Sequence, residues 1–258
     1  MTARSTNRDD YQNIPQPVAA MAKEFARGAV SHKHQHRRAQ LLYAVKGLFE
    51  VTTADSLFLV PPQHALWLPP QIDHEVRFRV ATMVRTLYID RKALPDLAPS
   101  APRVVHVSPL LRELIVRLTA LPIEYAPHDR VGRLASVTLE EIVWEPDDHL
   151  HLPLPKDKRL RRLHEALVKN PADNRSLEDW AKTVGASSRT LARLFQSECG
   201  TSFLNWRQQV RILAALPMLS AGVPVISVAL DLGYETPSAF TAMFRRITGI
   251  LPSQYFSS

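Results

Sequence analysis

The sequence predicts an α+β protein with two domains: an N-terminal antiparallel β-barrel with following helices, and an all-α C-terminal domain containing two helix-turn-helix units. Two observations predict this class. Short β-prone runs separated by Pro and Gly fill the first hundred residues, whereas the last third carries the same helical pattern twice. We expect a flexible tail at 1–20, the barrel domain at 21–150, a linker at 151–157 and the helical domain at 158–258.

The expected strands are rich in β-branched and aromatic residues and are bounded by turn signals such as Gly47, Pro61-Pro62 and Pro69-Pro70. They are residues 40–46, 48–53, 56–60, 65–68, 75–80 and 83–90. Helices are expected at 108–120 and 129–144, and the first of them carries an apolar stripe of Leu110, Leu111, Leu114 and Leu118 that would pack on the barrel. Three prolines in 145–158 exclude a continuous helix there.

The helical pattern repeats at residues 176–200 and 225–249. Ala181 stands four residues before Gly185, as Ala229 stands four before Gly233. The small Ala lets two helices approach each other, and Gly permits the positive φ of the turn between them. Ser187 and Thr236 are expected N-caps of the second helix of each unit. Two such units predict a protein that reads duplex DNA.

Apolar residues at helical spacing define the expected cores of both units. The inward positions are Leu177, Trp180, Ala181, Val184, Leu191, Leu194 and Phe195 in the first unit, and Ile226, Ala229, Leu230, Phe240, Met243, Phe244 and Ile247 in the second. The remaining positions are candidates for DNA contact: Ser188, Arg189, Thr190, Arg193 and Gln196, then Thr236, Ser238, Thr241, Ala242 and Arg245.

Positive charge is concentrated in the segment with these helices. From Lys156 onward the chain has 14 Lys plus Arg against 8 Asp plus Glu, whereas residues 1–155 have 18 against 17. Phosphate attraction requires such a distribution. Arg189 and Arg193 are preferred contacts because a guanidinium offers paired donors to guanine or phosphate. For any single Arg, a solvated helix face is the alternative interpretation.

Residues 225–256, which end in GILPSQYF, resemble the signature of the AraC/XylS family of bacterial transcription regulators, and the resemblance extends back to Lys158. It implies a seven-helix domain in which a central helix, here 202–220, holds the two units about one duplex turn apart. A helix of this length spans roughly 28 Å, near the ~34 Å between successive major-groove faces. Pro217 is expected to kink or end it.

The N-terminal part resembles a cupin, the usual sensor fold of that family. Gly28, His34, His36, Gln40 and Gly47 follow the spacing of the first cupin motif, with Gln where cupin enzymes usually have Glu. Pro69, Gln71 and His74 follow the core of the second. The resemblance implies a small-molecule effector, and a helix after the barrel that either packs on it or forms a homodimer.

Two interpretations of the histidines stay open. His34, His36 and His74 could converge on one divalent metal, with Gln40 as a fourth ligand or a partner of the ligands. Alternatively, they line an effector pocket together with Gln40 and Leu42, which alternation along a strand turns inward. Tyr43 and Trp67 are less certain pocket residues, since an aromatic in the ALWLPP stretch is more often core.

Other classes find less support in the sequence. No apolar run approaches ~20 residues, and the N-terminus lacks an apolar stretch, so we expect a cytoplasmic protein without a signal peptide. Cys199 is the single cysteine and is expected to be an inert, half-buried thiol. The favoured hypothesis is a regulator that binds promoter DNA and, if an activator, RNA polymerase. A cupin metalloenzyme with a DNA-binding tail and an architectural DNA protein without a ligand are the alternatives.

Overall fold

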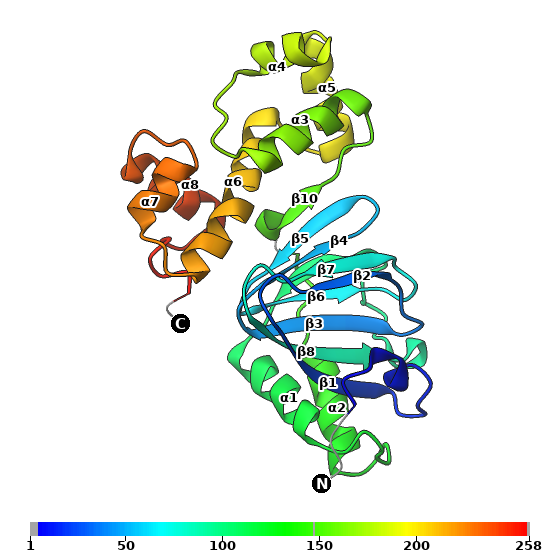
Figure 1. Cartoon of the computed structure of the whole chain (residues 1–258). Helices are drawn as coiled ribbons and strands as arrows, with labels where there is room; N and C mark the ends of the chain where they lie inside the picture. Colours follow the sequence, from blue (N-terminus) through cyan, green and yellow to red (C-terminus); the bar gives the residue numbers. More distant parts are fainter. Residues whose placement is uncertain (1–4, 147, 257–258) are drawn as a thin grey trace. The chain divides into compact units, whose positions relative to one another are not determined.

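The computed structural model describes residues 5–146 and 148–256 and divides the chain into two compact units (Figure 1). The first unit runs to Thr53 and from Phe58 to Asp148, and the second consists of residues 54–57 and 149–258. The first is mostly strands and the second mostly helices, as the sequence predicted. None of the helices in the described residues combines the length and apolarity that crossing a membrane requires.

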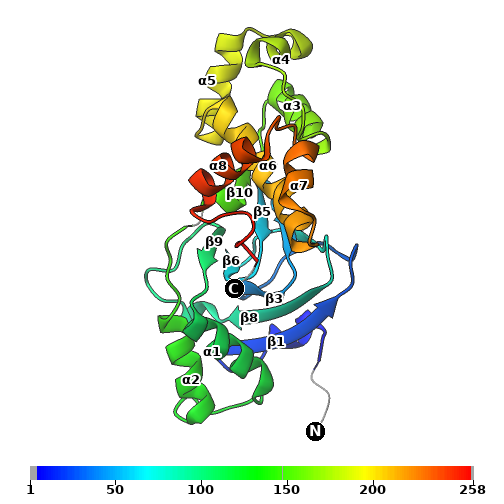
Figure 2. The same cartoon turned by 90° about the vertical axis from the view of Figure 1, so that its left-hand side faces the viewer.

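The first unit contains two antiparallel sheets that form a sandwich rather than a closed barrel (Figure 2). One sheet has the order β1-β8-β3-β6-β9 and the other includes β5-β4-β7-β2. The strands are β1 (Val18–Phe25), β2 (Val30–His34), β3 (Ala39–Lys46), β4 (Phe49–Thr52), β5 (Ser56–Val60), β6 (His64–Leu68), β7 (His74–Arg77), β8 (Thr82–Ile89) and β9 (Arg103–His106). All six predicted strands are present.

The sequence analysis missed β1 and β2 and was wrong to treat residues 5–20 as a tail; residues 1–4 lie outside the described residues. A short 3-10 helix, η1 (Arg8–Tyr11), precedes β1, and Tyr11 is fully buried. The Tyr11 ring stacks on Tyr88 of β8 at 5.7 Å between centroids. The first four residues of β1 are buried as well. An aromatic anchor and a buried apolar run therefore fix this segment on the sandwich. A second 3-10 helix, η2 (Arg91–Ala93), follows β8.

Two helices cover the first sheet in both views, α1 (Pro109–Ala120) and α2 (Arg130–Glu140). Ser108 caps α1, because its side chain accepts a hydrogen bond from the Leu111 N–H. Leu111, Ile115 and Leu118 join the core of the sheet. Leu110, which we placed on the packed stripe, is 53% exposed, because the buried stripe runs through Ile115 instead. Helix α2 ends four residues earlier than expected, yet Ile142 and Trp144 still pack on the core.

Over its described residues, which end at 256, the second unit contains six α-helices. They are α3 (Lys158–Lys169), α4 (Leu177–Val184), α5 (Ser188–Cys199), α6 (Phe203–Ser220), α7 (Val225–Asp231) and α8 (Pro237–Thr248). They follow η3 (Asp148–Leu150) and β10 (His151–Pro153), so part of the expected linker is a strand. The Leu154 N–H donates to the Asp55 carbonyl at 2.8 Å within this unit. Helix α6 continues through Pro217 and ends at Ser220, so Pro217 lies in its last turn without ending it at that residue; the alternative expectation, a kink, stays a prediction.

Candidate DNA interface and effector pocket

Helices α4 and α5 form the first helix-turn-helix unit. The Ser176 and Asp179 side chains make a reciprocal capping box at the start of α4. Gly185 ends α4 with φ of 71°, and the Ser187 hydroxyl then accepts from the Thr190 N–H to start α5. Trp180, Ala181, Leu191 and Phe195 are buried. The expected turn and caps are confirmed.

Helices α7 and α8 form the second unit with the same elements. Gly233 has φ of 76°, Thr236 caps α8 through the Ala239 N–H, and Pro237 is in the first turn. Ala229, Phe240, Met243 and Phe244 are buried as predicted.

The inward placement of Ile226 and Leu230 was wrong. These side chains are 60% and 56% exposed. Val228, Ala229 and Leu232 face the core instead. Residues four apart share one face of a helix, so turning Val228 and Leu232 inward turns Ile226 and Leu230 outward together.

The second helix of each unit presents the expected residues on its open face. On α5, Arg189, Arg193 and Gln196 are exposed, and Ser188 and Thr190 are half-buried. The Thr190 hydroxyl lies 2.9 Å from the Ser187 hydroxyl, so it takes part in the cap. On α8, the structure exposes Thr236, Ser238, Ala242 and Arg245, and half-buries Thr241. Each helix is therefore packed on one side and exposed to solvent on the other.

The sequence analysis missed two arginines that bear on this surface. Arg246 on α8 is exposed and donates to Gln208 Oε1 on α6 at 2.7 Å. Arg211 on α6 is only 5% exposed and donates to Asn174 Oδ1 at 2.7 Å. Helical periodicity did not identify Arg211, because this charged side chain is buried and follows neither the apolar core pattern nor the exposed polar one.

Arg211 and Asn174 connect the two helix-turn-helix units. Asn174 Nδ2 donates to the Gly233 carbonyl at 2.8 Å, and the Arg211 guanidinium lies 4.9 Å from the centroid of the Tyr234 ring. Asn174 precedes α4, whereas Gly233 and Tyr234 form the turn between α7 and α8. A polar network thus ties the first unit to the turn of the second, on a central helix that spans about 27 Å.

A pocket of about 440 Å³ lies between the two sheets of the first unit. All five residues expected at an effector site, His34, His36, Gln40, Leu42 and His74, line it. The neighbours of Gln40 and Leu42 along β3, Leu41 and Tyr43, are buried in the opposite core with Trp67. Tyr43 and Trp67 therefore belong to the core and not to the pocket.

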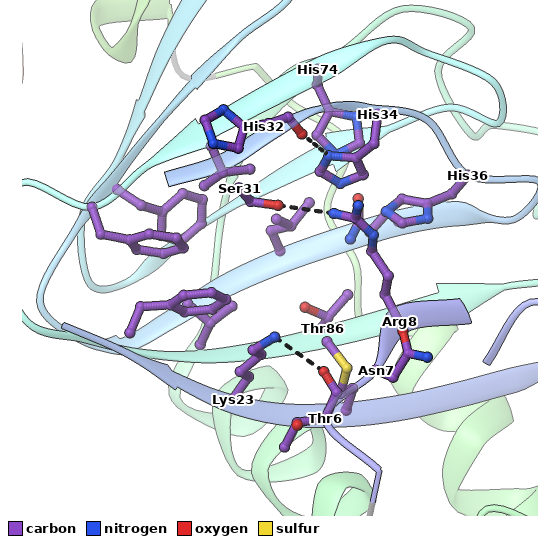
Figure 3. Close-up of a pocket in the computed structure, with 18 of the residues that line it drawn as sticks. Thr6, Asn7, Arg8, Lys23, Ser31, His32, His34, His36, His74 and Thr86 are labelled. Carbon is purple, nitrogen blue, oxygen red and sulfur yellow. Dashed lines mark hydrogen bonds between the residues drawn. The ribbon is translucent and has the colours of Figure 1, made fainter. Parts of the chain in front are cut away.

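The three histidines gather on one side of this pocket (Figure 3). Ring centroids of His34 and His74 are 4.3 Å apart, and those of His34 and His36 are 4.9 Å apart. Their ring nitrogens include one ligand atom each, and these three atoms lie within 4.8 Å of one another. His34 is opposite His74 in the β2–β7 pairing, which brings the two side chains together.

Hydrogen bonds fix the tautomers of two of these rings. His34 Nδ1 lies 2.6 Å from the His32 carbonyl oxygen, and His74 Nδ1 lies 2.9 Å from the Ile72 carbonyl oxygen. A carbonyl only accepts, so each Nδ1 carries the hydrogen and each Nε2 keeps a lone pair. Burial lowers the pKa of His36 to about 3 and that of His74 to about 4, and it also lowers the pKa of His34. All three rings are neutral near pH 7.

Three buried atoms around the pocket have no hydrogen-bond partner among the described residues: His36 Nε2, His74 Nε2 and Gln40 Oε1. An unsatisfied buried polar atom costs roughly 1–3 kcal/mol. Their convergence on one pocket indicates that something else bonds to them there. Lone pairs on nitrogen and an amide oxygen are suitable ligands for a divalent metal.

The sequence analysis missed the residues that η1 and β1 contribute to the pocket. Arg8 Nη1 donates to Ser31 Oγ at 2.9 Å, and Lys23 Nζ donates to the Thr6 carbonyl at 3.2 Å (Figure 3). Met21, Lys23 and Phe25 line the pocket at alternate positions of β1. This period of two is a signal that could have found them, had the strand been recognised.

Cys199 is buried at the end of α5. Burial raises the pKa of its thiol to about 11, so the thiol is protonated at neutral pH.

Comparisons with known proteins match both parts of the chain. The family model described as an AraC-like ligand binding domain matches residues 20–139, and the model described as a helix-turn-helix domain matches residues 180–258. The HTH-type transcriptional regulator NimR of Escherichia coli is 34% identical over 224 residues, which are 87% of this chain and 81% of that protein.

Further relatives match the C-terminal part. The HTH-type transcriptional regulator RipA of Corynebacterium glutamicum is 40% identical over 103 residues, 40% of this chain and 31% of that protein. The arabinose operon regulatory protein of Escherichia coli is 31% identical over 111 residues, 42% of this chain and 37% of that protein.

Among solved structures, ToxT from Vibrio cholerae O395 aligns with 93% of this chain and 96% of its own chain, at 11% identity and a TM-score of 0.39.

Proposed function

Since this chain belongs to the AraC family of transcriptional regulators, we propose that it binds promoter DNA through α5 and α8 and that occupancy of the histidine-lined pocket changes this binding. The chain is a regulator with a ligand-binding N-terminal domain and a DNA-binding helix-turn-helix domain. We further assign the residues that contact DNA and the pocket that controls DNA binding.

One observation supports the DNA contacts most strongly. Both second helices are packed on one face, whereas their other faces expose polar and cationic side chains. We assign base and phosphate contacts to this open face. Its members are Ser188, Arg189, Thr190, Arg193, Thr236, Ser238, Thr241, Ala242 and Arg245.

We assign the effector to the pocket of the first unit, against His34, His36, Gln40, Leu42 and His74. The relatives are named transcriptional regulators, so we propose that the pocket binds its small molecule without converting it. Incubation of the protein with its effector should return the molecule unchanged. Multiple turnovers to a new product would favour the metalloenzyme alternative.

Three finer parts belong to the same proposal. The protein acts in the cytoplasm on duplex DNA, it forms a homodimer through α1 and α2, and at activated promoters it contacts RNA polymerase. Leu110 on α1 and Val137 on α2 support the dimer, because these apolar side chains are 53% and 42% exposed. Sedimentation equilibrium of Leu110→Asp and Val137→Asp would test it, since a dimer interface should dissociate into monomers.

Mapping of the genomic sites that the protein occupies tests the DNA-binding proposal. Wild type should occupy discrete promoter sites, and the double variant Arg189→Ala/Arg193→Ala should lose them. A matched control is Arg161→Ala/Arg162→Ala, which removes the same charge from exposed positions of α3. Equal loss in both double variants would mean that overall charge, and not the α5 face, determines occupancy.

A further inference from the structure

We propose that His34, His36 and His74 hold one divalent first-row transition metal, and that this metal binds the carboxylate of an amphiphilic effector. The inference rests on the proposed effector pocket and names both its cofactor and the chemical class of its ligand.

The three imidazoles are prepared as metal ligands. His36 and His74 are 5% and 2% exposed, and the Nε2 atom of each lacks a hydrogen-bond partner among the described residues. Carbonyl groups hold Nδ1–H of His34 and His74, as second partners of metal-bound histidines commonly do. Three nitrogen ligands in a tetrahedral site lie about 3.4 Å apart, given metal bonds of about 2.1 Å. The observed limit of 4.8 Å requires only small side-chain movements.

The residue types in the histidine cluster indicate which metals it would bind. Imidazole nitrogens suit zinc, copper, nickel and iron, whereas magnesium and calcium prefer oxygen ligands. The cluster contains three histidines and no carboxylate. A bound metal would therefore keep its full double positive charge, and three protein ligands would leave coordination positions for an exogenous group.

The positive charge of Arg8 beside the histidines favours an anion. Arg8 and Lys23 line the same pocket, and Figure 3 shows the Arg8 guanidinium between Ser31 and His36. Lys33 also lines it but pairs with Asp73 at 3.0 Å. Asp9 is an acidic lining residue and offsets one of these charges. A metal together with Arg8 leaves an excess of positive charge at this end, and a carboxylate can both bind the metal and accept from a guanidinium.

The other end of the pocket is mainly aromatic, with Lys23 Nζ 5.2 Å from the Phe25 ring centroid. The Phe25 and Phe78 rings stack at 3.9 Å between centroids, and Phe49 lies 6.0 Å from Phe78. In the β2–β7 pairing, Val30 is opposite Arg77 and His34 is opposite His74. Four residues of strand separate these pairs by about 13 Å. An effector with a carboxylate at one end and an aromatic or aliphatic body fits this division.

Cobalt(II) titration of the untagged full-length protein tests the metal site. Visible absorption should saturate at one equivalent per chain, with the bands of a nitrogen-bound ion. His36→Gln and His74→Gln should bind cobalt at least 100-fold more weakly. His32→Gln is the matched control, since His32 lines the pocket but lies outside the cluster, and it should bind like wild type. Failure of folded wild type to bind, or equal binding by all variants, would overturn the proposal.

Addition of 3-phenylpropionate to the cobalt-loaded protein tests the ligand class. The carboxylate should shift the cobalt bands, and the neutral 3-phenylpropanamide should not. Arg8→Gln should weaken the carboxylate response about tenfold and leave cobalt affinity unchanged. Equal responses to acid and amide would contradict an anionic effector. DNA binding by the same preparations separates the two proposals, because loss of the metal inference alone leaves sequence-specific DNA binding intact.

Discussion

The two helix-turn-helix units share one backbone arrangement, but they differ in the residues that form their turns and helix caps. The turn of the first runs from Gly185 to Ser187, and that of the second is two residues longer, from Leu232 to Thr236. Helix α4 begins with a capping box, whereas α7 begins after Pro224 without a side-chain cap. The second unit receives outside support instead, because its turn is bonded to Asn174. The segment before α4 therefore supports the turn of the second unit.

The open faces differ more than the cores do. Arg189 and Arg193 stand six and two residues before the buried Phe195, and Ser238 and Ala242 stand at the same distances before the buried Phe244. Equivalent positions thus carry two cations in one unit and small residues in the other. Arg245 and Arg246 are the exposed cations of α8 and follow Phe244, where α5 has Gln196 and Ser197 after Phe195. We infer that the two helices place their electrostatic contacts on different turns.

The largest difference in stability between the two units is expected for substitutions of their turn glycines. A Cβ on Gly233 would lie 2.5 Å from the Ala172 carbonyl oxygen, whereas nothing lies within 4 Å of a Cβ on Gly185. Both have positive φ, so Gly185→Ala should cost about 1 kcal/mol and Gly233→Ala about 3 kcal/mol or more. Hydrogen exchange of residues 158–256 would measure both. Equal costs would mean that the contact with Ala172 relaxes freely.

Arg193 tests how the cations of α5 contribute to DNA binding. Arg193→Ala should weaken specific binding by about 1–3 kcal/mol if the side chain reaches a base. A phosphate contact would instead weaken specific and random DNA alike and lower the salt dependence of binding. Titration of both DNAs at several salt concentrations separates these roles. An unchanged affinity for both would remove Arg193 from the interface.

The capping box of α4 should contribute a smaller amount. Ser176→Ala removes the acceptor of the Asp179 N–H and should destabilise the second unit by about 1 kcal/mol. Ser197→Ala is the control, because Ser197 is exposed within α5 and caps no helix. Denaturant unfolding compares them. Identical midpoints would show that the box adds nothing to stability.

The smallest effect is expected at the exposed apolar pair of α7. Ile226→Gln and Leu230→Gln should each change stability by less than about 0.5 kcal/mol, because both side chains already contact water. Val228→Ala, at a fully buried position of the same helix, should cost about 1.5 kcal/mol. If the Gln variants cost as much as Val228→Ala, the assignment of the buried face of α7 is wrong.

Periodicity and small-residue spacing predicted the helical unit well. Gly and Ala positions determined both turns, and N-cap residues determined the starts of α5 and α8, since these effects are local. The buried face of α7 was harder to predict. A helix of seven residues with apolar side chains on both sides has two plausible inward faces, and only tertiary packing chooses between them.

Only part of the pocket lining could be predicted from the sequence. Alternation along β3 identified Gln40 and Leu42, because it depends on strand geometry, and the resemblance to the cupin motifs identified His34, His36 and His74. Arg8 and Lys23 were missed since β1 begins in an alanine-rich run with weak strand propensity, and since η1 is positioned by the buried ring of Tyr11. Contacts between distant segments, such as Tyr11 with Tyr88, leave no local signal.

Hydroxyl-radical footprinting at a mapped operator tests most directly whether α5 and α8 of one chain read the same duplex. We predict two protected patches on one face of the DNA, about 10 base pairs apart. Arg193→Ala should weaken protection of one patch and Arg245→Ala that of the other. A single patch, or one patch that responds to both substitutions, would contradict the account.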